Sequence, residues 1–407
     1  MAQYSIRDKC HINTNFETDT FVGIKFEDGD YSVNFPIGYR LSDDEHDLRK
    51  DILLLLHVLS THTNRKESKK INYTIDLDTL GFPLQSYLYM ISDYYKRGYY
   101  KEHEKQFHHA IHGKIDWSKT IKQVRPYIQN DDAFYISFIT RKNTINQNEL
   151  ITQIHEYCVY ESFRKLGWLF TPTLPKKPRI KYNQKLFLHI IGEKYNQTFN
   201  DDEKELFKNM IAIVQQMKDP NLETDFYYGT SRFEYVWESM IDKVFGIEGK
   251  DFYFPKTTWI LPDGSHDNAN LEPDTIMIHN GNIYVIDAKY YKYGITLRPS
   301  DLPESTSINK QITYGEYIAT QEKFHDLHGK YQVYNAFLIP FAAKSGMPFI
   351  KHLGEALSNW KGNQETYERI EGLLIDCKHL MSISSHRDYI EIMRLAQSIQ
   401  EAIKDKL

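Results

Sequence analysis

The stretch LEPDTIMIHNGNIYVIDAKYYKYG, residues 271–294, joins two apolar runs that each carry an acidic residue at one end. Asp274 stands beside the first run, and Asp287 closes the second, with Lys289 two positions later. Asn280-Gly281 between the runs is a strong signal for a type I′ hairpin. Side chains alternate across a strand, so Asp287 and Lys289 point the same way, and the hairpin brings Asp274 alongside them. We therefore predict two carboxylates and one ammonium at the edge of a sheet.

The text around this hairpin predicts an α/β core. The expected elements, in order, are a helix at 233–245, strands at 274–279 and 283–289, a helix at 307–322, strands at 332–339 and 367–375, and a helix at 385–404. The chain leaves the second hairpin strand and returns through a helix to residues 332–339. Such a crossover predicts a buried, parallel strand pair.

The acids at the end of a buried strand indicate a metal site. Two carboxylates a few ångströms apart repel each other unless a positive charge lies between them. Mg²⁺, or Mn²⁺ in its place, binds one or two carboxylates and bridges to phosphate. We expect Asp274, Asp287 and the Ala288 carbonyl to hold the metal, and Lys289 to hold the attacking water or neutralise the transition state. The ordinary alternative is a surface hairpin with an Asp–Lys pair, against which the apolar strand before Asp287 argues.

Two flanking helices add polar residues. Glu234 and Glu238 lie four residues apart on the helix at 233–245, and either one could reach the metal or orient Lys289. We expect Glu238 to fill this role, with Glu234 as the competing residue. The alternative is that both are solvent-facing glutamates on an amphipathic helix.

The segment INKQITYGEYI places Lys310, Gln311 and Tyr314 on the helix that follows the hairpin. We expect these residues to contact the substrate phosphate or the metal shell. The alternative is an ordinary polar helix face.

The N-terminal part predicts a mainly helical α+β region. Residues 20–36 alternate around Asp28-Gly29 and predict a hairpin. In SDDE, Ser42 and Glu45 form an expected capping box for the helix that follows. Further helices are expected at about 84–112, 148–167 and 200–218, with a proline-containing linker, TPTLPKKPR, before the last. We place the domain boundary between 1–222, which would bind DNA or a partner, and 223–407, the catalytic domain.

Composition limits the function classes. The chain has 407 residues and a net charge of -5, so DNA contacts must come from local patches, of which KKPRIKYNQK, residues 176–185, is the densest. A solvated linker is the ordinary explanation of that run. Three distant cysteines exclude a disulfide frame or a cysteine zinc site. No signal peptide or long apolar run occurs, so we expect a cytoplasmic protein without a membrane contact.

Two histidine patterns are set aside. The first is a histidine cluster whose spacing suggests a zinc-binding site: His103, His108, His109 and His112. A polar helix face explains this cluster better, because no HExxH or cysteine partner is present. His155 and Cys158 lie three apart on an expected helix and favour core packing over a catalytic pair.

At these residues the sequence resembles the PD-(D/E)xK nuclease superfamily. EPD…IDAK, with a helix glutamate upstream and KQ..Y downstream, is similar to restriction enzymes of the LlaJI type and to McrC-like subunits. The sequence upstream also resembles the segments that precede the nuclease core in such proteins. These stretches are FPIGYRLSDDEHDLRKDILLLL, IHGKIDWSKTI and NELITQIHEYCVYESFRKLGWLF. The resemblance thus covers most of the chain.

The resemblance implies a restriction-endonuclease-like α/β/α core and Mg²⁺-dependent cleavage of double-stranded DNA in a restriction system. It carries over Asp274, Asp287 and Lys289, and Glu238 less directly. The spacing from Gln311 to Tyr314 is three residues, where RecB-like relatives have four. A McrB-like AAA+ GTPase is the implied partner. The chain itself has no GxxxxGK[ST] loop, so a nucleotide would have to be bound by a second polypeptide.

Two alternatives remain open. One is a stand-alone type II restriction endonuclease, in which a homodimer would cut both strands. The other is a non-catalytic DNA- or partner-binding subunit whose nuclease fold is vestigial. The presence of both acids and the lysine argues against the second.

Overall fold

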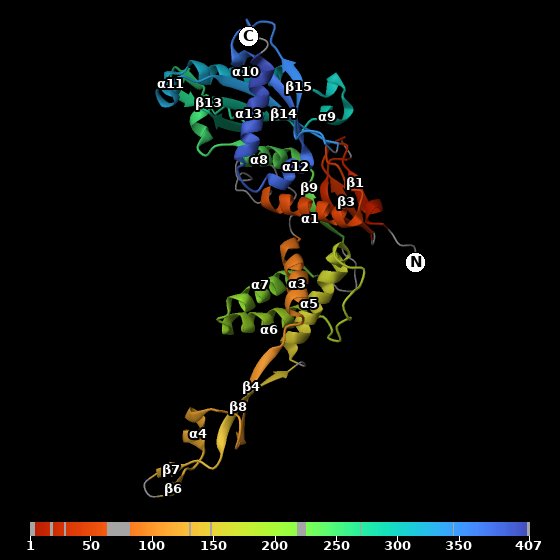
Figure 1. Cartoon of the computed structure of the whole chain (residues 1–407), viewed down its shortest axis with the longest axis vertical. Coiled ribbons are helices and arrows are strands. Elements are labelled where there is room, and N and C mark those ends of the chain that lie inside the picture. Colours follow the sequence, from red (N-terminus) through yellow and green to blue (C-terminus); the bar gives the residue numbers. More distant parts are fainter. Residues whose placement is uncertain are drawn as a thin grey trace. The chain divides into compact units, whose positions relative to one another are not determined.

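The computed structural model describes residues 5–16, 19–27, 30–62, 82–129, 132–146, 149–217, 225–268, 270–344 and 346–404. The chain forms two compact units (Figure 1). The first consists of Met1–Gly81 together with Thr224–Leu407, and the second is Phe82–Glu223. The fold is mixed α/β, as expected.

A five-stranded sheet is the centre of the first unit. Its order is β12-β13-β14-β16-β15. The strands are β12 (Thr275–His279), β13 (Asn282–Ala288), β14 (Val333–Phe341), β15 (Ile350–Ala356) and β16 (Ile370–Asp376). The β13–β14 and β14–β16 pairs are parallel, and the outer pairs are antiparallel. Every residue of β14 and β16 is buried, which is typical of parallel strands covered on both faces.

Helices cover both faces of this sheet. On one face, α10 (Ser305–Thr320) packs Tyr314 and Ile318 against the β12–β14 side chains Ile276 and Val285. On the other, α8 (Phe233–Phe245), α12 (Cys377–Ile383) and α13 (Tyr389–Lys404) contact the strands. There the Trp237 indole N–H donates to the Leu338 carbonyl at 3.3 Å. The sheet therefore lies between two layers of helix.

The hairpin of the sequence analysis is present. β12 and β13 pair antiparallel with Ile276 opposite Val285. Asn280 and Gly281 both have positive φ, 49° and 78°, as the central residues of a type I′ turn require. The parallel pair of β13 with β14 also confirms the expected crossover.

Other elements of the first unit were not expected or begin elsewhere. Strand β15 and the exposed hairpin of β10 (Thr258–Leu261) and β11 (Gly264–Asp267) were missed. The last strand and the last helix begin at Ile370 and Tyr389, three and four residues later than predicted. Short helical segments fill the connections: η1 (Ile6–Lys9), η4 (Lys250–Tyr253), α9 (Tyr293–Thr296), η5 (Pro299–Asp301), α11 (Glu322–His328) and η6 (Thr366–Glu368).

The N-terminal residues build a second sheet within the first unit. Its order is β1-β3-β2-β9, from β1 (Cys10–Ile12), β2 (Val22–Glu27), β3 (Asp30–Phe35) and β9 (Phe226–Thr230). The predicted hairpin at 20–36 is confirmed by the antiparallel β2–β3 pair, although Asp28-Gly29 lies outside the described residues.

This sheet divides the chain differently from the expected boundary at residue 222. Strand β9 is the neighbour of β2, and α1 (Glu45–His62) packs against α8. These contacts join Met1–Gly81 to the C-terminal part. Only Phe82–Glu223 stands as a separate unit. The sequence-based division missed this because a strand pairing between residues so far apart leaves no local signal.

Helix α1 does not start with the expected capping box. Asp44 accepts hydrogen bonds from the amides of His46 and Asp47, at 2.9 and 3.1 Å. Ser42 lies before the helix, where its amide donates to Asp51 at 2.8 Å. An aspartate nearer the first turn thus caps the helix.

The second unit combines four long helices with a β-ribbon. The helices are α3 (Leu84–Arg97), α5 (Leu150–Leu166), α6 (Gln184–Gln197) and α7 (Asp201–Gln216), and η3 (Gly167–Leu169) follows α5. The ribbon pairs β4 (Glu102–Ala110) with β8 (Phe138–Asn146), and carries β5 (Lys114–Ile115), α4 (Trp117–Gln123), β6 (Tyr127–Gln129) and β7 (Asp132–Phe134). Figure 1 shows the ribbon running out from the helices.

The helix expected at 84–112 is wrong in its second half. Helix α3 ends at Arg97, where Gly98 takes a positive φ of 74°. The histidines after it lie on or beside strand β4, so the expected helix face is also wrong. The predicted linker at 171–178 is non-helical, and Asn200 caps α7 as expected.

Candidate active site

The hairpin brings the expected acids and lysine together at the end of β13. The Lys289 ammonium lies 2.7 Å from Oδ2 of Asp287. Oδ2 of Asp274 accepts a hydrogen bond from the Ala288 amide at 2.8 Å, so Asp274 lies directly beside the strand end. The Asp287 and Lys289 side chains are only 10% and 17% exposed, which makes the cluster a recessed one at the strand end.

The surroundings of Asp274 disfavour its charged form. Burial raises the pKa of Asp274 well above its usual value, and the hydrogen bond and charge of Asp287 raise it further. The Ala288 amide acts in the opposite direction. A cation between the two carboxyls would offset this repulsion.

Helix α8 contributes Glu238 to the same cluster. Burial, followed by the charges of Asp287 and Glu234, raises the pKa of Glu238 to about 7. Glu238 in turn raises the pKa of Asp274. Glu234 lies one turn earlier and affects the cluster through Glu238. The structure thus places Glu238 nearer to both hairpin acids.

Helix α10 brings the three residues of the KQ..Y segment to this region in different ways. Lys310 feels the charges of Asp287 and Asp274; burial disfavours its charge, but its hydrogen bond with Tyr314 and these acids leave its pKa raised. The Tyr314 hydroxyl donates to the Glu272 carbonyl at 3.3 Å, just before Asp274. Both side chains therefore flank the cluster.

Gln311 is fully buried and holds strand β13 instead. Its side-chain amide donates to the Val285 carbonyl at 2.7 Å and to Oδ1 of Asn335 at 3.4 Å. This position supports the strand that carries Asp287. Contact of Gln311 with substrate would require the helix to move.

Lys250 is a cluster residue that the sequence reasoning missed. Its ammonium donates to the main-chain carbonyl of Asp274 and forms a 3.0 Å ion pair with Asp242 on α8. It also lowers the pKa of Glu238. Lys250 thus connects α8 to the residue that precedes β12. No spacing rule relates the first residue of a short helical turn to an aspartate 24 positions later.

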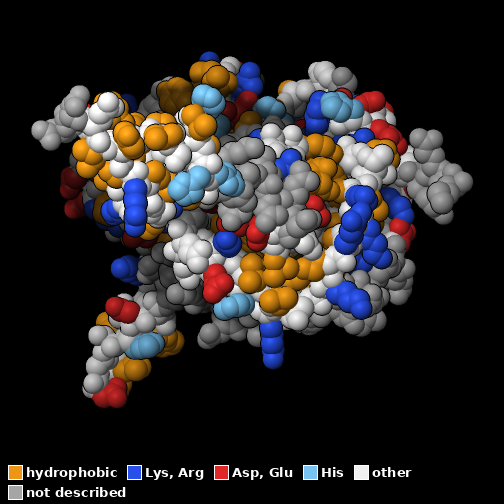
Figure 2. All heavy atoms as spheres, turned by 90° about the horizontal axis from the view of Figure 1, so that it is seen from below, with side chains coloured by type: hydrophobic (Ala, Val, Ile, Leu, Met, Phe, Trp, Pro, Cys, Tyr) orange, Lys and Arg blue, Asp and Glu red, His pale blue; other side chains and the backbone are white. Residues whose placement is uncertain are grey.

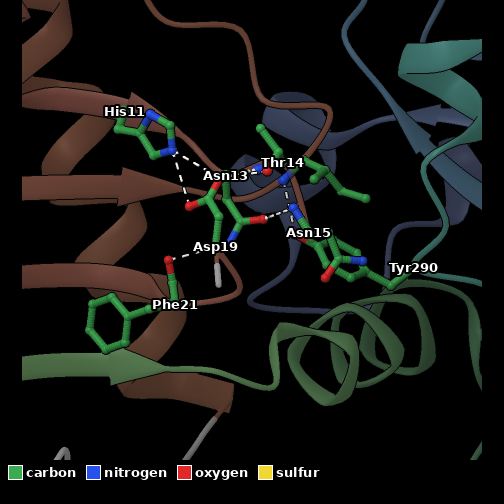
Figure 3. A network of polar contacts seen from close by, with 8 residues as sticks. His11, Asn13, Thr14, Asn15, Asp19, Phe21 and Tyr290 are labelled. Atoms are coloured by element: carbon green, nitrogen blue, oxygen red, sulfur yellow. Dashed lines mark hydrogen bonds and ion pairs between the residues drawn. The ribbon is translucent and has the colours of Figure 1, made fainter. Parts of the chain in front are cut away.

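Tyr290 links the end of β13 to the N-terminal sheet. Its hydroxyl accepts a hydrogen bond from the Ile37 amide at 2.8 Å, and its ring contacts Phe233 at a centroid distance of 5.4 Å. Figure 3 shows Tyr290 beside a polar network of the N-terminal segment, in which Asp19 accepts from His11 and Thr14. The position next to Lys289 is therefore anchored from two directions.

The residues present fit a divalent cation of the Mg²⁺ type. The described residues hold no group of three or more His, Cys, Asp or Glu side chains in metal-binding positions. Mg²⁺ needs fewer protein ligands, since it binds through one or two carboxylates and keeps several waters. Asp274 and Asp287 lie at the same strand end, on the Ala288 amide and beside Lys289, and the Ala288 carbonyl is at that strand end too.

The other polar patterns lie in structural positions. His155 and Cys158 are fully buried, and burial lowers the pKa of His155 to about 4. The Tyr100 amide donates to Nδ1 of His155 at 3.1 Å, so this pair belongs to the core, as expected. All three cysteines are free. Among the described residues, no helix is long and apolar enough to cross a membrane.

A family model described as LlaJI restriction endonuclease matches residues 21–351. The chain belongs to this family. The match runs from the N-terminal sheet through the second unit to strand β15, and it includes every candidate residue of the cluster. It confirms the resemblance to LlaJI-type restriction enzymes and places the chain among restriction-system nucleases.

A curated relative supports the same class. The "Type II restriction enzyme BsuMI component YdjA" of Bacillus subtilis (strain 168) is 25% identical over 327 residues, which cover 73% of this chain and 67% of the relative.

Two solved structures are also similar. One is a half-complex from a tetradecameric assembly of Thermococcus gammatolerans McrB AAA+ hexamers with bound McrC; its TM-score is 0.36 at 13% identity, over 96% of this chain and 83% of that chain. The other is the McrBC complex of the same organism, with a TM-score of 0.23 at 14% identity, over 56% of this chain and 68% of that chain.

Proposed function

We propose that this LlaJI-family protein is the Mg²⁺-dependent nuclease subunit of a restriction system and hydrolyses phosphodiesters of double-stranded DNA with a PD-(D/E)xK centre. The observation that carries the proposal is the cluster at the end of β13. There Oδ2 of Asp274 accepts from the Ala288 amide at 2.8 Å, and the Lys289 ammonium lies 2.7 Å from Oδ2 of Asp287. Such a cluster is poised to accept a cation and a phosphate together.

Each residue has a role that follows from its position. A bound Mg²⁺ would supply a water of lowered pKa and would stabilise charge on the phosphate. Asp274 and Asp287 would hold it, with the Ala288 carbonyl and Glu238 completing the shell. The Lys289 ammonium, held by Asp287, orients the attacking water and offsets negative charge that develops on the phosphate. Lys310 would face the substrate phosphate, whereas the buried Tyr314 supports the Glu272 carbonyl just before Asp274.

The proposal includes a partner, a McrB-like AAA+ GTPase. The chain has no GxxxxGK[ST] loop and so lacks the usual cradle for a nucleoside triphosphate. The name of the Bacillus subtilis relative describes it as a component of a restriction enzyme, in agreement with a subunit role. A stand-alone type II enzyme, acting as a homodimer, would instead cut plasmid with Mg²⁺ alone.

Cleavage assays of matched variants test the proposal. Plasmid and Mg²⁺, with any required partner, are incubated with the wild type or with one of three variants. Asp287→Asn and Lys289→Ala change the cluster. Asp326→Asn is the control, because the Asp326 side chain is exposed on α11. Each of the first two variants should lose at least about 10³-fold in cleavage rate, the scale of a missing electrostatic group in an active site. The control should cut normally.

The same assay separates the alternatives. Cleavage by the wild type without GTP or partner would favour the stand-alone enzyme. Full cleavage by either cluster variant would contradict the proposed centre, and an inactive wild type under every condition would favour a vestigial nuclease fold.

A further inference from the structure

One segment of the second unit has an unusual charge pattern. The sequence has 55 acidic residues, yet none occurs from Ser162 to Gly192. Within this stretch, residues 176–185 carry five cations, all of them exposed: Lys176, Lys177, Arg179, Lys181 and Lys185. In the described part of the chain, none of the five forms an ion pair with a carboxylate. Most other clusters of charge on a protein surface contain both signs, so this one is locally positive.

Residues 176–185 are held in place at their C-terminal end. Pro178 within them, and Pro172 and Pro175 just before them, restrict the backbone. The Tyr182 hydroxyl donates to the carbonyls of Val214 and Met217, at 3.1 and 2.7 Å. The Gln184 side chain donates to the Val214 carbonyl at 3.0 Å. The cations therefore stand on a backbone that is fixed to the end of α7.

The side chains of the segment alternate between contact and exposure. Pro178, Ile180 and Tyr182 are half-buried, whereas the cations at 177, 179 and 181 between them are exposed. The segment then leads into α6, whose first turn contains no acidic residue. The positive end of that helix dipole adds to the positive potential. The arrangement presents a row of cations on one side.

We propose that this basic segment, residues 176–185, binds the phosphate backbone of double-stranded DNA. The proposal rests on the proposed function and deepens it, since it names residues outside the candidate cleavage centre that hold the DNA. Charge complementarity is its basis: closely spaced exposed cations release the counterions of DNA when each one neutralises a phosphate. Lys and Arg contacts of this kind position DNA and carry no sequence information. On the face that Figure 2 shows, side chains of both charges stand among apolar side chains.

The test measures DNA affinity separately from cleavage. The parent protein is the full chain with Asp287→Asn, and its affinity for a fluorescent duplex is measured at NaCl concentrations from about 50 to about 200 mM. The basic-segment variant carries Lys177→Ala/Arg179→Ala/Lys181→Ala in addition. The slope of log affinity against log salt is compared between the two proteins. We expect the triple variant to bind at least about tenfold more weakly, with a slope smaller by about 3. Its melting temperature should not change, because the three side chains are exposed.

A second triple variant controls for net charge. Lys96→Ala/Lys122→Ala/Lys208→Ala removes three exposed cations from helices α3, α4 and α7 of the same unit. We expect its affinity and slope to stay close to those of the parent.

Three results would overturn the proposal. The first is a salt-dependence slope of the basic-segment variant equal to that of the parent. The second is an equal loss of DNA affinity in both triple variants. The third is that the basic-segment variant loses binding to a protein partner while its DNA affinity is unchanged. A failure of the proposed function would appear separately, as cleavage by the Asp287→Asn parent.

Discussion

At the scale of single residues, the cluster at the end of β13 owes its chemistry to burial. Asp274 and Glu238 have raised pKa values first because they are buried and then because Asp287 lies beside them. Lys289 is the nearest positive group and forms an ion pair with Asp287. Among the described residues, Lys289 is the lysine that forms an ion pair with one of the three acids, whereas Lys250 pairs with Asp242, so the metal-free cluster is short of positive charge.

This shortage predicts a pH-dependent stability that Glu238 controls. Its pKa is about 7 in the folded chain, above its ordinary value of 4.5. The stability contributed by the bound proton is fully present below the ordinary pKa and is lost as pH rises through 7. Glu238→Gln cannot ionise, so at pH about 8 it should melt about 2–4 °C above the wild type, the shift that about 1 kcal/mol gives in a domain of this size.

Melting curves in chelator over a range of pH check this prediction. The difference should disappear below the ordinary pKa of a glutamate, where Glu238 is protonated in both the folded and the unfolded wild type. Glu401→Gln, an exposed change on α13, is the control and should follow the wild type at every pH. If the melting temperature of Glu238→Gln differed from that of the wild type by the same amount at every pH, the pKa of Glu238 would not be raised in the folded chain.

The cluster could be predicted from the sequence because its main members are local. Asp274, Asp287 and Lys289 belong to one hairpin, and its turn and alternation determine which side chains meet. For the acid on α8, the sequence could only reduce the choice to two glutamates, Glu234 and Glu238. Lys250 and Tyr290 could not be predicted in their roles, since they depend on contacts with main-chain groups distant in sequence.

At the scale of elements, helix α10 owes its position to a close approach at Gly315. A Cβ built there would lie 2.5 Å from Nδ2 of Asn335 and 2.9 Å from Cβ of Tyr367. Asn335 is fully buried in β14 and donates to the Tyr367 carbonyl at 2.6 Å. The missing side chain thus lets the helix that carries Lys310 and Tyr314 lie directly on the sheet.

Gly315→Ala should therefore destabilise the first unit. The added methyl group displaces the Asn335 amide, and overpacking of this kind costs about 1–3 kcal/mol. Urea unfolding of the full chain measures the loss. The control is Gly192→Ala on α6, where a Cβ meets nothing within 4 Å. That change should stabilise by about 0.4–1 kcal/mol, and equal effects of the two changes would contradict the packing argument.

The elements differed in how well their sequences predicted them. The apolar runs of β12, β13 and β14 and the periodic face of α8 are strong signals, and these elements lie within two residues of the prediction. Strand β4 was misread as helix because its many histidines and lysines show no apolar alternation. The exposed hairpin β10–β11 has no buried face to produce a pattern.

At the scale of the whole molecule, the first unit is built from two separate parts of the chain. Strand β9 completes the sheet that β1, β2 and β3 begin. Tyr290 binds the Ile37 amide next to Lys289. The sheet that carries Asp287 and the N-terminal sheet therefore belong to one folded body, and Phe82–Glu223 is inserted into its sequence.

This organisation makes a prediction about fragments. Residues 224–407 alone should fold poorly, because β9 and α8 lose their N-terminal partners. A chain in which a flexible linker replaces residues 82–223 should keep one cooperative unfolding transition. Urea unfolding and protease resistance of both fragments measure the difference. A stable, cooperative fragment 224–407 would show that the first 81 residues are dispensable for the fold.

The most direct test of the central claim is a crystal of this protein soaked in Mn²⁺ and measured at the manganese absorption edge. We predict one anomalous peak between the carboxyl groups of Asp274 and Asp287, and its loss in crystals of Asp287→Asn. A wild-type crystal with no peak at the end of β13, or with these carboxyls turned away from each other, would contradict the account.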